Sequence, residues 1–223
     1  MPDPKKKYIR SYVPPSRPGF LVSPTGFGGS LASLPTAAAP VTPPPAPLPS
    51  SDLDKLYKYL VSSRGGSREA WERGINAIAY HETGGTMDPT TIQLTPTGRN
   101  GAGRGLYQFE TSAGSNEART AVNRAVQFYR TVLNEPVPSW VAKLDKQQGD
   151  IEFNKLPAEQ QTALFIMNGV MKPGRFSDIL GTQERITNYW LNHHWSGSAA
   201  KRPAEQQKFN KSYGLYLRSL ESN

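Results

Sequence analysis

One glutamate of this 223-residue chain lies at a position that is otherwise apolar. Trp71, Ile75 and Ile78 are separated by four and three residues, which is the spacing of one face of an α-helix, and four more residues lead to Glu82. Gly84 and its neighbouring glycine end the predicted helix, so the carboxyl group lies in the last turn. Burial and the negative end of the helix dipole both disfavour the ionised form. A carboxyl group that keeps its proton near neutral pH can act as a general acid, for instance in glycosidic cleavage.

Simpler explanations of Glu82 are a side chain that turns into solvent or one that pairs with Arg104. Two further carboxylates, Asp88 and Glu110, are candidates for positioning water in a hydrolytic reaction. Asp88 precedes a proline and also fits a turn, and Glu110 also fits a charge at the end of a hairpin. The residues therefore allow a mechanism with one carboxylate or with two.

The elements that must position these residues are mostly helices. Periodic apolar residues and helix-ending glycines and prolines predict helices at about 51–64, 67–83, 115–134, 138–147, 157–170 and 182–194, and a last one from residue 203. The helical period disappears between Gly84 and Gly114. There, residues 90–95 are β-prone, 96–105 are rich in turn residues, and 105–109 can pair back as a strand. We therefore predict a mainly α, α+β domain with one small β-hairpin insert.

The first fifty residues have a different composition from the rest. They hold 13 of the 20 prolines and carry five Lys and Arg residues against one Asp, whereas all four tryptophans follow residue 50. This predicts an extended, proline-rich basic tail at 1–50 without a fold of its own, and one globular domain at 51–223. Prolines follow Lys5–Lys7 where a secretory signal would be apolar, so no such signal is expected.

Composition also excludes several kinds of site. With no cysteine there is no disulfide and no thiolate metal site, and no apolar run approaches the length of a membrane span. His81-Glu82 begins like a zinc-protease motif, but Gly85 stands where the second histidine belongs, and His193-His194 fits a polar surface pair. The net charge of +8 suits any polyanion and indicates no specific nucleic-acid partner. No metal and no cofactor are expected.

Four sequence blocks nevertheless occur together. They are Ala77–Gly85 (AIAYHETGG), Met87–Pro89 (MDP), Gly103–Phe109 (GRGLYQF) followed by Thr111–Ala113 (TSA), and Ala163–Gly169 (ALFIMNG). In this order they resemble the soluble lytic transglycosylase and goose-type lysozyme superfamily, over roughly residues 70–170. Members have a helix ending in Glu-Ser, a loop ending in Pro, a Gly-Leu-Met-Gln turn and an Ala-Tyr-Asn-Ala-Gly helix.

The resemblance implies a lysozyme-like fold and a reaction. Glu82 would protonate the bridging oxygen between N-acetylmuramic acid and N-acetylglucosamine, and would then act as general base. The acetamido group of the substrate assists in this family, so no second carboxylate is needed and the product is an anhydro sugar. Gln108, Tyr107 and Asn168 would bind the glycan strand.

The sequence departs from the family pattern at several positions. Thr83 replaces the usual Ser, and Tyr107 replaces the usual Met. Met167 stands where the family has a tyrosine that hydrogen-bonds the acid, and Tyr189 is a candidate to supply that hydroxyl. The segment from Thr90 to Gly103 is longer than usual. These differences affect the expected substrate contacts more than the expected chemistry.

A peptidoglycan-cleaving domain without a signal peptide needs another route to its substrate. Bacteriophages carry such domains in the tail or among internal virion proteins, and the tail at 1–50 would suit an anchor to other virion proteins. The expected location is therefore a phage virion that acts in the host cell envelope or periplasm. The alternatives are a lysozyme-type hydrolase that uses Glu82 with Asp88 or Glu110, and a non-catalytic virion structural protein with a lysozyme-like fold.

Overall fold

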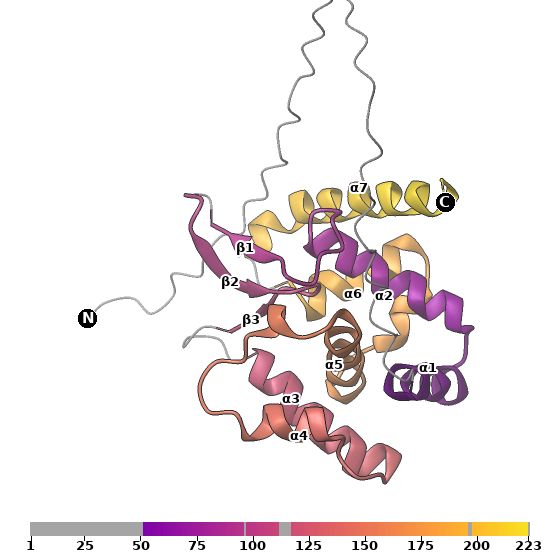
Figure 1. Ribbon diagram of the computed structural model, residues 1–223. Helices are drawn as coiled ribbons and strands as arrows, with labels where there is room; N and C mark the ends of the chain where they lie inside the picture. Colours follow the sequence, from indigo (N-terminus) through magenta and orange to yellow (C-terminus); the bar gives the residue numbers. More distant parts are fainter. Residues whose placement is uncertain (1–50, 96, 112–116, 196–197, 223) are drawn as a thin grey trace, which may run out of the picture.

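The computed structural model describes residues 51–95, 97–111, 117–195 and 198–222 (Figure 1). The tail expected at 1–50 lies outside the described residues, and so do Ser112 and Ala113 of the third sequence block. The described chain is mainly helical and contains a small three-stranded antiparallel sheet.

Helices form where the apolar periodicity predicts them. They are α1 (Ser51–Arg64), α2 (Arg68–Glu82), α3 (Glu117–Gln127), α4 (Ser139–Lys146), α5 (Ala158–Met171), α6 (Gln183–His193) and α7 (Arg202–Glu221). Short 3₁₀ turns lie at Phe153–Lys155, Phe176–Leu180 and Ala199–Lys201. One expected helix differs, because α3 continues as a π-helical segment, Phe128–Leu133, instead of running as an α-helix to residue 134. Asn134 ends this segment in a left-handed conformation, with φ of 53°.

The helix ends follow local chemistry. Ser67 caps α2, and its side-chain oxygen accepts a hydrogen bond from the backbone N–H of Ala70 at 3.2 Å. At the other end Thr83 is the C-cap, and the positive φ angles of Gly84 and Gly85, 63° and 92°, turn the chain away. The position of Glu82 at the end of α2 is therefore set by residues next to it in sequence.

Helix α5 is the centre of the fold. Figure 1 shows it between the α3–α4 pair and the α2–α7 pair. All residues from 161 to 167 are buried, and a helix that is apolar on every side needs neighbours on every side. The rest of the core comes from one face of each surrounding helix, including Trp71, Ile75 and Ile78 of α2.

The sheet differs from the expected hairpin. Strand β1 (Ile92–Leu94) pairs with β2 (Asn100–Arg104), and β2 pairs with β3 (Phe109–Glu110). The central strand therefore comes from the segment that the sequence assigned to turns. The reverse holds for 105–108, which was expected to be a strand and forms a turn instead. The residues at the two ends of this segment explain why it is not a strand. Gly105 and Gln108 have φ angles of 72° and 48°, outside the range of a strand.

Glycines also explain how β2 forms. A Cβ atom on Gly101 would lie 2.9 Å from Oε1 of Gln93, and one on Gly103 would lie 2.7 Å from Oε1 of Gln108. The absence of side chains at these two positions lets both glutamine side chains lie against the strand.

Within the described ranges, no helix is long and apolar enough to cross a lipid bilayer.

Candidate active site

The carboxyl group of Glu82 is buried at the end of α2, with its side chain 6% exposed. Trp190 of α6 donates a hydrogen bond from its indole Nε1 to Glu82 Oε1 at 2.6 Å. Nε2 of His194, the residue that caps α6, lies 3.4 Å from the same oxygen. The sequence also allowed a Glu82 side chain that turns into solvent or one that pairs with Arg104. The first of these explanations is wrong, because the side chain is buried. Arg104, the other candidate partner, donates to the backbone carbonyls of Gly101 and Gly103.

His194 also connects Glu82 to the turn at 105–108. Its Nε2 lies 2.5 Å from the backbone carbonyl oxygen of Tyr107. A carbonyl oxygen only accepts hydrogen bonds, so Nε2 must carry the hydrogen. This N–H therefore donates to the Tyr107 carbonyl, and Glu82 Oε1 lies 3.4 Å from the same nitrogen. The side chain is 9% exposed, which makes the expectation of a polar surface pair wrong for His194.

The two N–H groups affect the chemistry of the acid. An indole N–H can only donate, so Glu82 Oε1 is an acceptor whether or not the carboxyl is protonated. A proton on the carboxyl is then favoured on Oε2. When the group is ionised, the same N–H groups stabilise the negative charge and partly offset the cost of burying it. The arrangement suits a group that gives up a proton and takes it back.

Gln161 of α5 fixes the turn that faces His194. Its Oε1 accepts a hydrogen bond from the backbone N–H of Leu106 at 2.7 Å, and its Nε2 donates to the carbonyl oxygens of Pro89 and Leu156 at 3.0 and 2.8 Å. The side chain is fully buried. A Cβ atom on Gly105 would lie 2.2 Å from Gln161 Oε1, so only glycine fits there. The buried amide thus holds the turn that carries the Tyr107 carbonyl.

Tyr107 and Gln108 belong to this turn, and both are buried. The Tyr107 ring stacks on Phe165 at a centroid distance of 4.1 Å, and its hydroxyl lies 3.1 Å from Oγ1 of Thr162. With an exposed fraction of zero, the side chain is part of the core, which corrects the expectation that it binds substrate. Gln108 is 2% exposed, and its Nε2 donates to the Gly105 carbonyl at 2.7 Å.

Asn168 belongs to α5, and Tyr189 belongs to α6, one residue before Trp190. Asn168 Oδ1 accepts a hydrogen bond from Arg124 Nη1 at 2.7 Å. The Tyr189 ring packs against Phe176 and His193, with centroid distances of 5.7 and 5.1 Å. Neighbouring residues on a helix point about 100° apart. Trp190, the residue after Tyr189, is therefore the α6 side chain that donates to Glu82.

The two candidates for a second carboxylate have local hydrogen bonds. Oδ1 of Asp88 accepts from the backbone N–H and the hydroxyl of Thr90, at 2.8 and 2.7 Å. These two hydrogen bonds lower the pKa of Asp88, and the geometry is that of a turn. Glu110 lies in β3, and its backbone N–H donates to Glu117 at 3.3 Å.

His81, next to Glu82, packs beneath the site. Its ring contacts Trp190 and Phe209 at centroid distances of 4.6 and 4.9 Å, and its Nδ1 lies 3.1 Å from Oγ of Ser212. Burial lowers the pKa of His81, so the neutral form is favoured. In the part of the chain that the structure describes, no group of three or more His, Asp or Glu side chains is placed to hold a metal ion.

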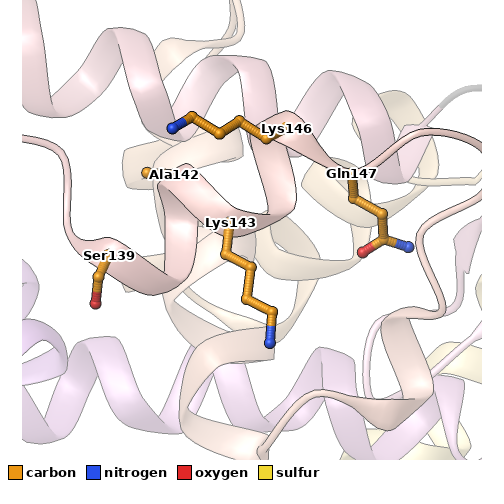
Figure 2. A pocket seen from close by; sticks show the side chains of 5 residues that line it. All are labelled: Ser139, Ala142, Lys143, Lys146 and Gln147. Carbon is orange, nitrogen blue, oxygen red and sulfur yellow. The ribbon is translucent and has the colours of Figure 1, made fainter.

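A shallow depression on α4 is separate from this site. Figure 2 shows the five residues that line it, namely Ser139, Ala142, Lys143, Lys146 and Gln147. In Figure 1, α4 lies on the opposite side of α5 from α2 and α7.

Sequence reasoning identified Glu82 but missed three of its supporting residues, Trp190, His194 and Gln161. A signal for the first two exists, because Ile186, Trp190 and His194 follow one another at intervals of four residues and therefore share one face of α6. No comparable pattern marks Gln161. Comparison of the chain with protein-family models, with curated proteins and with solved structures finds no match.

Proposed function

We propose that this protein cleaves peptidoglycan as a lytic transglycosylase, with Glu82 as its single general acid and base. The observation that carries the proposal is the buried Glu82 carboxyl, whose Oε1 accepts the indole N–H of Trp190 and lies 3.4 Å from Nε2 of His194. A small antiparallel sheet beside the end of an acid-bearing helix is also compatible with the lysozyme-like fold that the four sequence blocks imply.

The proposed reaction has two proton transfers. Glu82 gives its proton to the oxygen that bridges N-acetylmuramic acid and N-acetylglucosamine, and the bond from that oxygen to the muramic anomeric carbon breaks. The acetamido group of the muramic residue stabilises the positive charge that develops there. The Glu82 carboxylate then takes the proton of the same sugar's 6-hydroxyl as this oxygen bonds to the anomeric carbon. The products are an anhydromuramic end and a regenerated acid.

The hydrolytic alternative needs a second carboxylate to position water. Asp88 is exposed and its Oδ1 is engaged with Thr90, which favours the turn role over catalysis. Glu110 remains the second candidate. Because the single-acid mechanism requires neither, it is the reaction that we propose.

The location follows from the same reasoning. We propose a phage virion protein that opens the host cell wall at infection and is held in the particle by residues 1–50, whose basic, proline-rich composition suits an anchor. A virion protein without catalytic activity is the competing proposal, and a turnover assay separates the two.

The test is Glu82→Gln, assayed on purified sacculi with mass spectrometry of the products. The amide keeps an oxygen for the Trp190 N–H but cannot deliver a proton, so cleavage should fall by about 10²–10⁴-fold or more. Glu205→Gln is the matched control, because Glu205 is also a buried glutamate but pairs with Lys208 on α7. This control should cleave at close to the parent rate.

Three results would change the assignment. Parent-like cleavage by Glu82→Gln would refute the catalytic role of Glu82. Loss of activity in Asp88→Asn or Glu110→Gln, together with reducing-end products from the parent, would indicate a hydrolase. A folded parent protein that releases no product from sacculi would favour the structural alternative.

A further inference from the structure

Three basic side chains and the His193 imidazole lie around Tyr189, on the side of α6 that does not face Glu82. Arg124 comes from α3, Lys172 caps α5, and His193 is the last residue of α6. Arg64, the last residue of α1, also acts on Tyr189 through its charge, as Arg124 does. Three segments far apart in sequence, α1, α3 and the end of α5, therefore bring cationic side chains to one place, beside the His193 ring.

Two hydrogen bonds define the geometry of this cluster. Arg124 Nη1 donates to Asn168 Oδ1 at 2.7 Å, and Lys172 Nζ donates to the backbone carbonyl oxygen of His193 at 2.5 Å. The His193 ring lies against Tyr189 at a centroid distance of 5.1 Å. The Asn168 amide is thereby oriented with its oxygen toward the guanidinium.

Among the described residues, Arg64, Arg124 and Lys172 form no ion pair. The carboxylates that act on the cluster are Glu117, which acts on Lys172, and Asp178, which acts on His193 but is paired with Arg185 at 2.7 Å.

Lys172 lies near charges of both signs. Burial lowers the pKa of Lys172, the charge of Glu117 raises it, and the repulsion from Arg124, the smallest of the three effects, lowers it. An anion bound between the two side chains would reduce this repulsion. Arg124, Asn168, Lys172 and His193 are all partly exposed, so a ligand can reach them.

We propose that Arg124 and Lys172, together with Asn168, bind a carboxylate of the peptide that peptidoglycan carries on N-acetylmuramic acid. A guanidinium presents paired N–H donors that match a carboxylate, and the Lys172 ammonium adds a second charge. The uncharged hydroxyl and acetamido groups of the glycan offer no such partner. The inference rests on the proposed function, because it identifies the part of the same substrate that the cluster would recognise.

The test compares binding of two glycans by the full chain carrying Glu82→Gln, which prevents cleavage during the titration. One glycan is a soluble oligomer with its peptides, and the other is the same oligomer after its peptide carboxylates have been converted to amides, which leaves the lactyl–peptide bond intact. At fixed ionic strength the form with free peptide carboxylates should bind about tenfold more tightly. Adding Arg124→Gln or Lys172→Gln should abolish this difference, whereas Arg124→Lys, which keeps the charge, should retain part of it.

Matched controls remove a positive charge elsewhere. Arg130→Gln, after α3, and Lys143→Gln, on α4, change exposed cations and should leave the tenfold difference intact. Thermal unfolding of every variant verifies that binding is compared between folded proteins. If the controls lose the difference as fully as Arg124→Gln does, the effect is one of net charge and the proposed site is refuted.

The remaining outcomes separate this inference from the proposed function. Equal affinities for the two glycans, in a parent protein that cleaves sacculi, would overturn the carboxylate site and leave the function standing. A preference for the glycan with free peptide carboxylates that depends on Arg124, in a parent that releases no product from sacculi, would support the carboxylate site and refute the proposed function. Inorganic phosphate is titrated in parallel, and if it binds through Arg124 while amidation of the peptide carboxylates has no effect, the site takes a phosphate and the carboxylate assignment is wrong.

Discussion

The indole Nε1 of Trp190 lies 2.6 Å from Oε1 of Glu82, although 108 residues separate the two in the sequence. This hydrogen bond joins the last turn of α2 to α6 and determines which carboxyl oxygen is an acceptor. A tyrosine hydroxyl was expected to play this part, with Tyr189 as the candidate to supply it. The indole of the following residue occupies the position, and it can donate but cannot accept.

The first prediction concerns Trp190→Phe. The phenyl ring keeps most of the packing against His81 and Phe209 but removes the N–H, so the catalytic proton is no longer directed to Oε2. A lost hydrogen bond to a charged group corresponds to a fall in turnover of about ten- to a hundredfold. Turnover on sacculi, normalised to folded protein, measures it.

Trp140→Phe is the control for this change. Trp140 also donates its indole N–H to a carboxylate, Asp52 Oδ2, at 2.8 Å, between α4 and α1. It should lose some stability but no turnover. Equal losses of turnover in the two variants would mean that the Trp190 contact acts only through folding.

The second prediction concerns the turn that faces His194. Gly105→Ala should destabilise the fold by about 2–4 kcal/mol, because a Cβ atom would lie 2.2 Å from Gln161 Oε1 and the φ angle of 72° is itself strained for alanine. Gly98→Ala is the matched control, since its φ of 76° is nearly the same and nothing lies within 4 Å of the added atom. It should cost about 1–2 kcal/mol. Urea unfolding compares them, and equal losses would argue against the role of Gln161.

The third prediction is a loss of stability in acid that depends on His81. Burial lowers the pKa of His81 in the folded protein, while in the unfolded chain it is about 6.5. Between these values the unfolded chain binds more protons, so the free energy of unfolding rises with pH and falls as the pH drops below about 6.5. One such group contributes a slope of at most about 1.4 kcal/mol per pH unit.

Urea unfolding at pH 7.5 and 5.5 should therefore give a smaller pH difference for His81→Gln than for the parent. The groups that act on His81 are Glu82, Glu205, His194 and Lys208. Burial also lowers the pKa of His193, which is more exposed, so His193→Gln should reduce the difference less. If His81→Gln and the parent lose the same stability in acid, His81 is not the group responsible.

The fourth prediction separates the tail from the domain. Because the core residues of the described chain run from Leu56 to Tyr216, residues 51–223 alone should unfold cooperatively and remain helical by circular dichroism. Residues 1–50 alone should have no cooperative transition. A fragment 51–223 that melts without cooperativity would contradict the boundary at residue 50.

The same deletion tests the anchoring role of the tail. Removing residues 1–50 should leave cleavage of isolated peptidoglycan largely intact and should remove the protein from assembled particles. Incorporation of the shortened chain at the parent level would show that the anchor lies in the folded domain.

The sequence by itself determined the helices and the place of Glu82. Helical hydrogen bonds are local, so apolar spacing and flanking glycines were enough to predict α2, its buried face and its end at Gly84. The proline-rich composition likewise set residues 1–50 apart without any structural information.

The order of the strands was decided by contacts across the sheet. Glycines weaken a strand in isolation, so the segment of β2 was predicted as a turn. In the folded protein its missing side chains make room for Gln93 and Gln108. Neither glutamine follows from the local pattern around β2.

Only the tertiary structure decided what surrounds the acid. Periodicity indicates which face of a helix is buried but not which other helix covers it, so α6 could not be paired with α2 from spacing alone. The contacts of Glu82 with Trp190, of His194 with Tyr107 and of Gln161 with Leu106 join residues 108, 87 and 55 positions apart. Such contacts form only when the helices pack, because buried polar groups must then find partners that the chain brings from a distance.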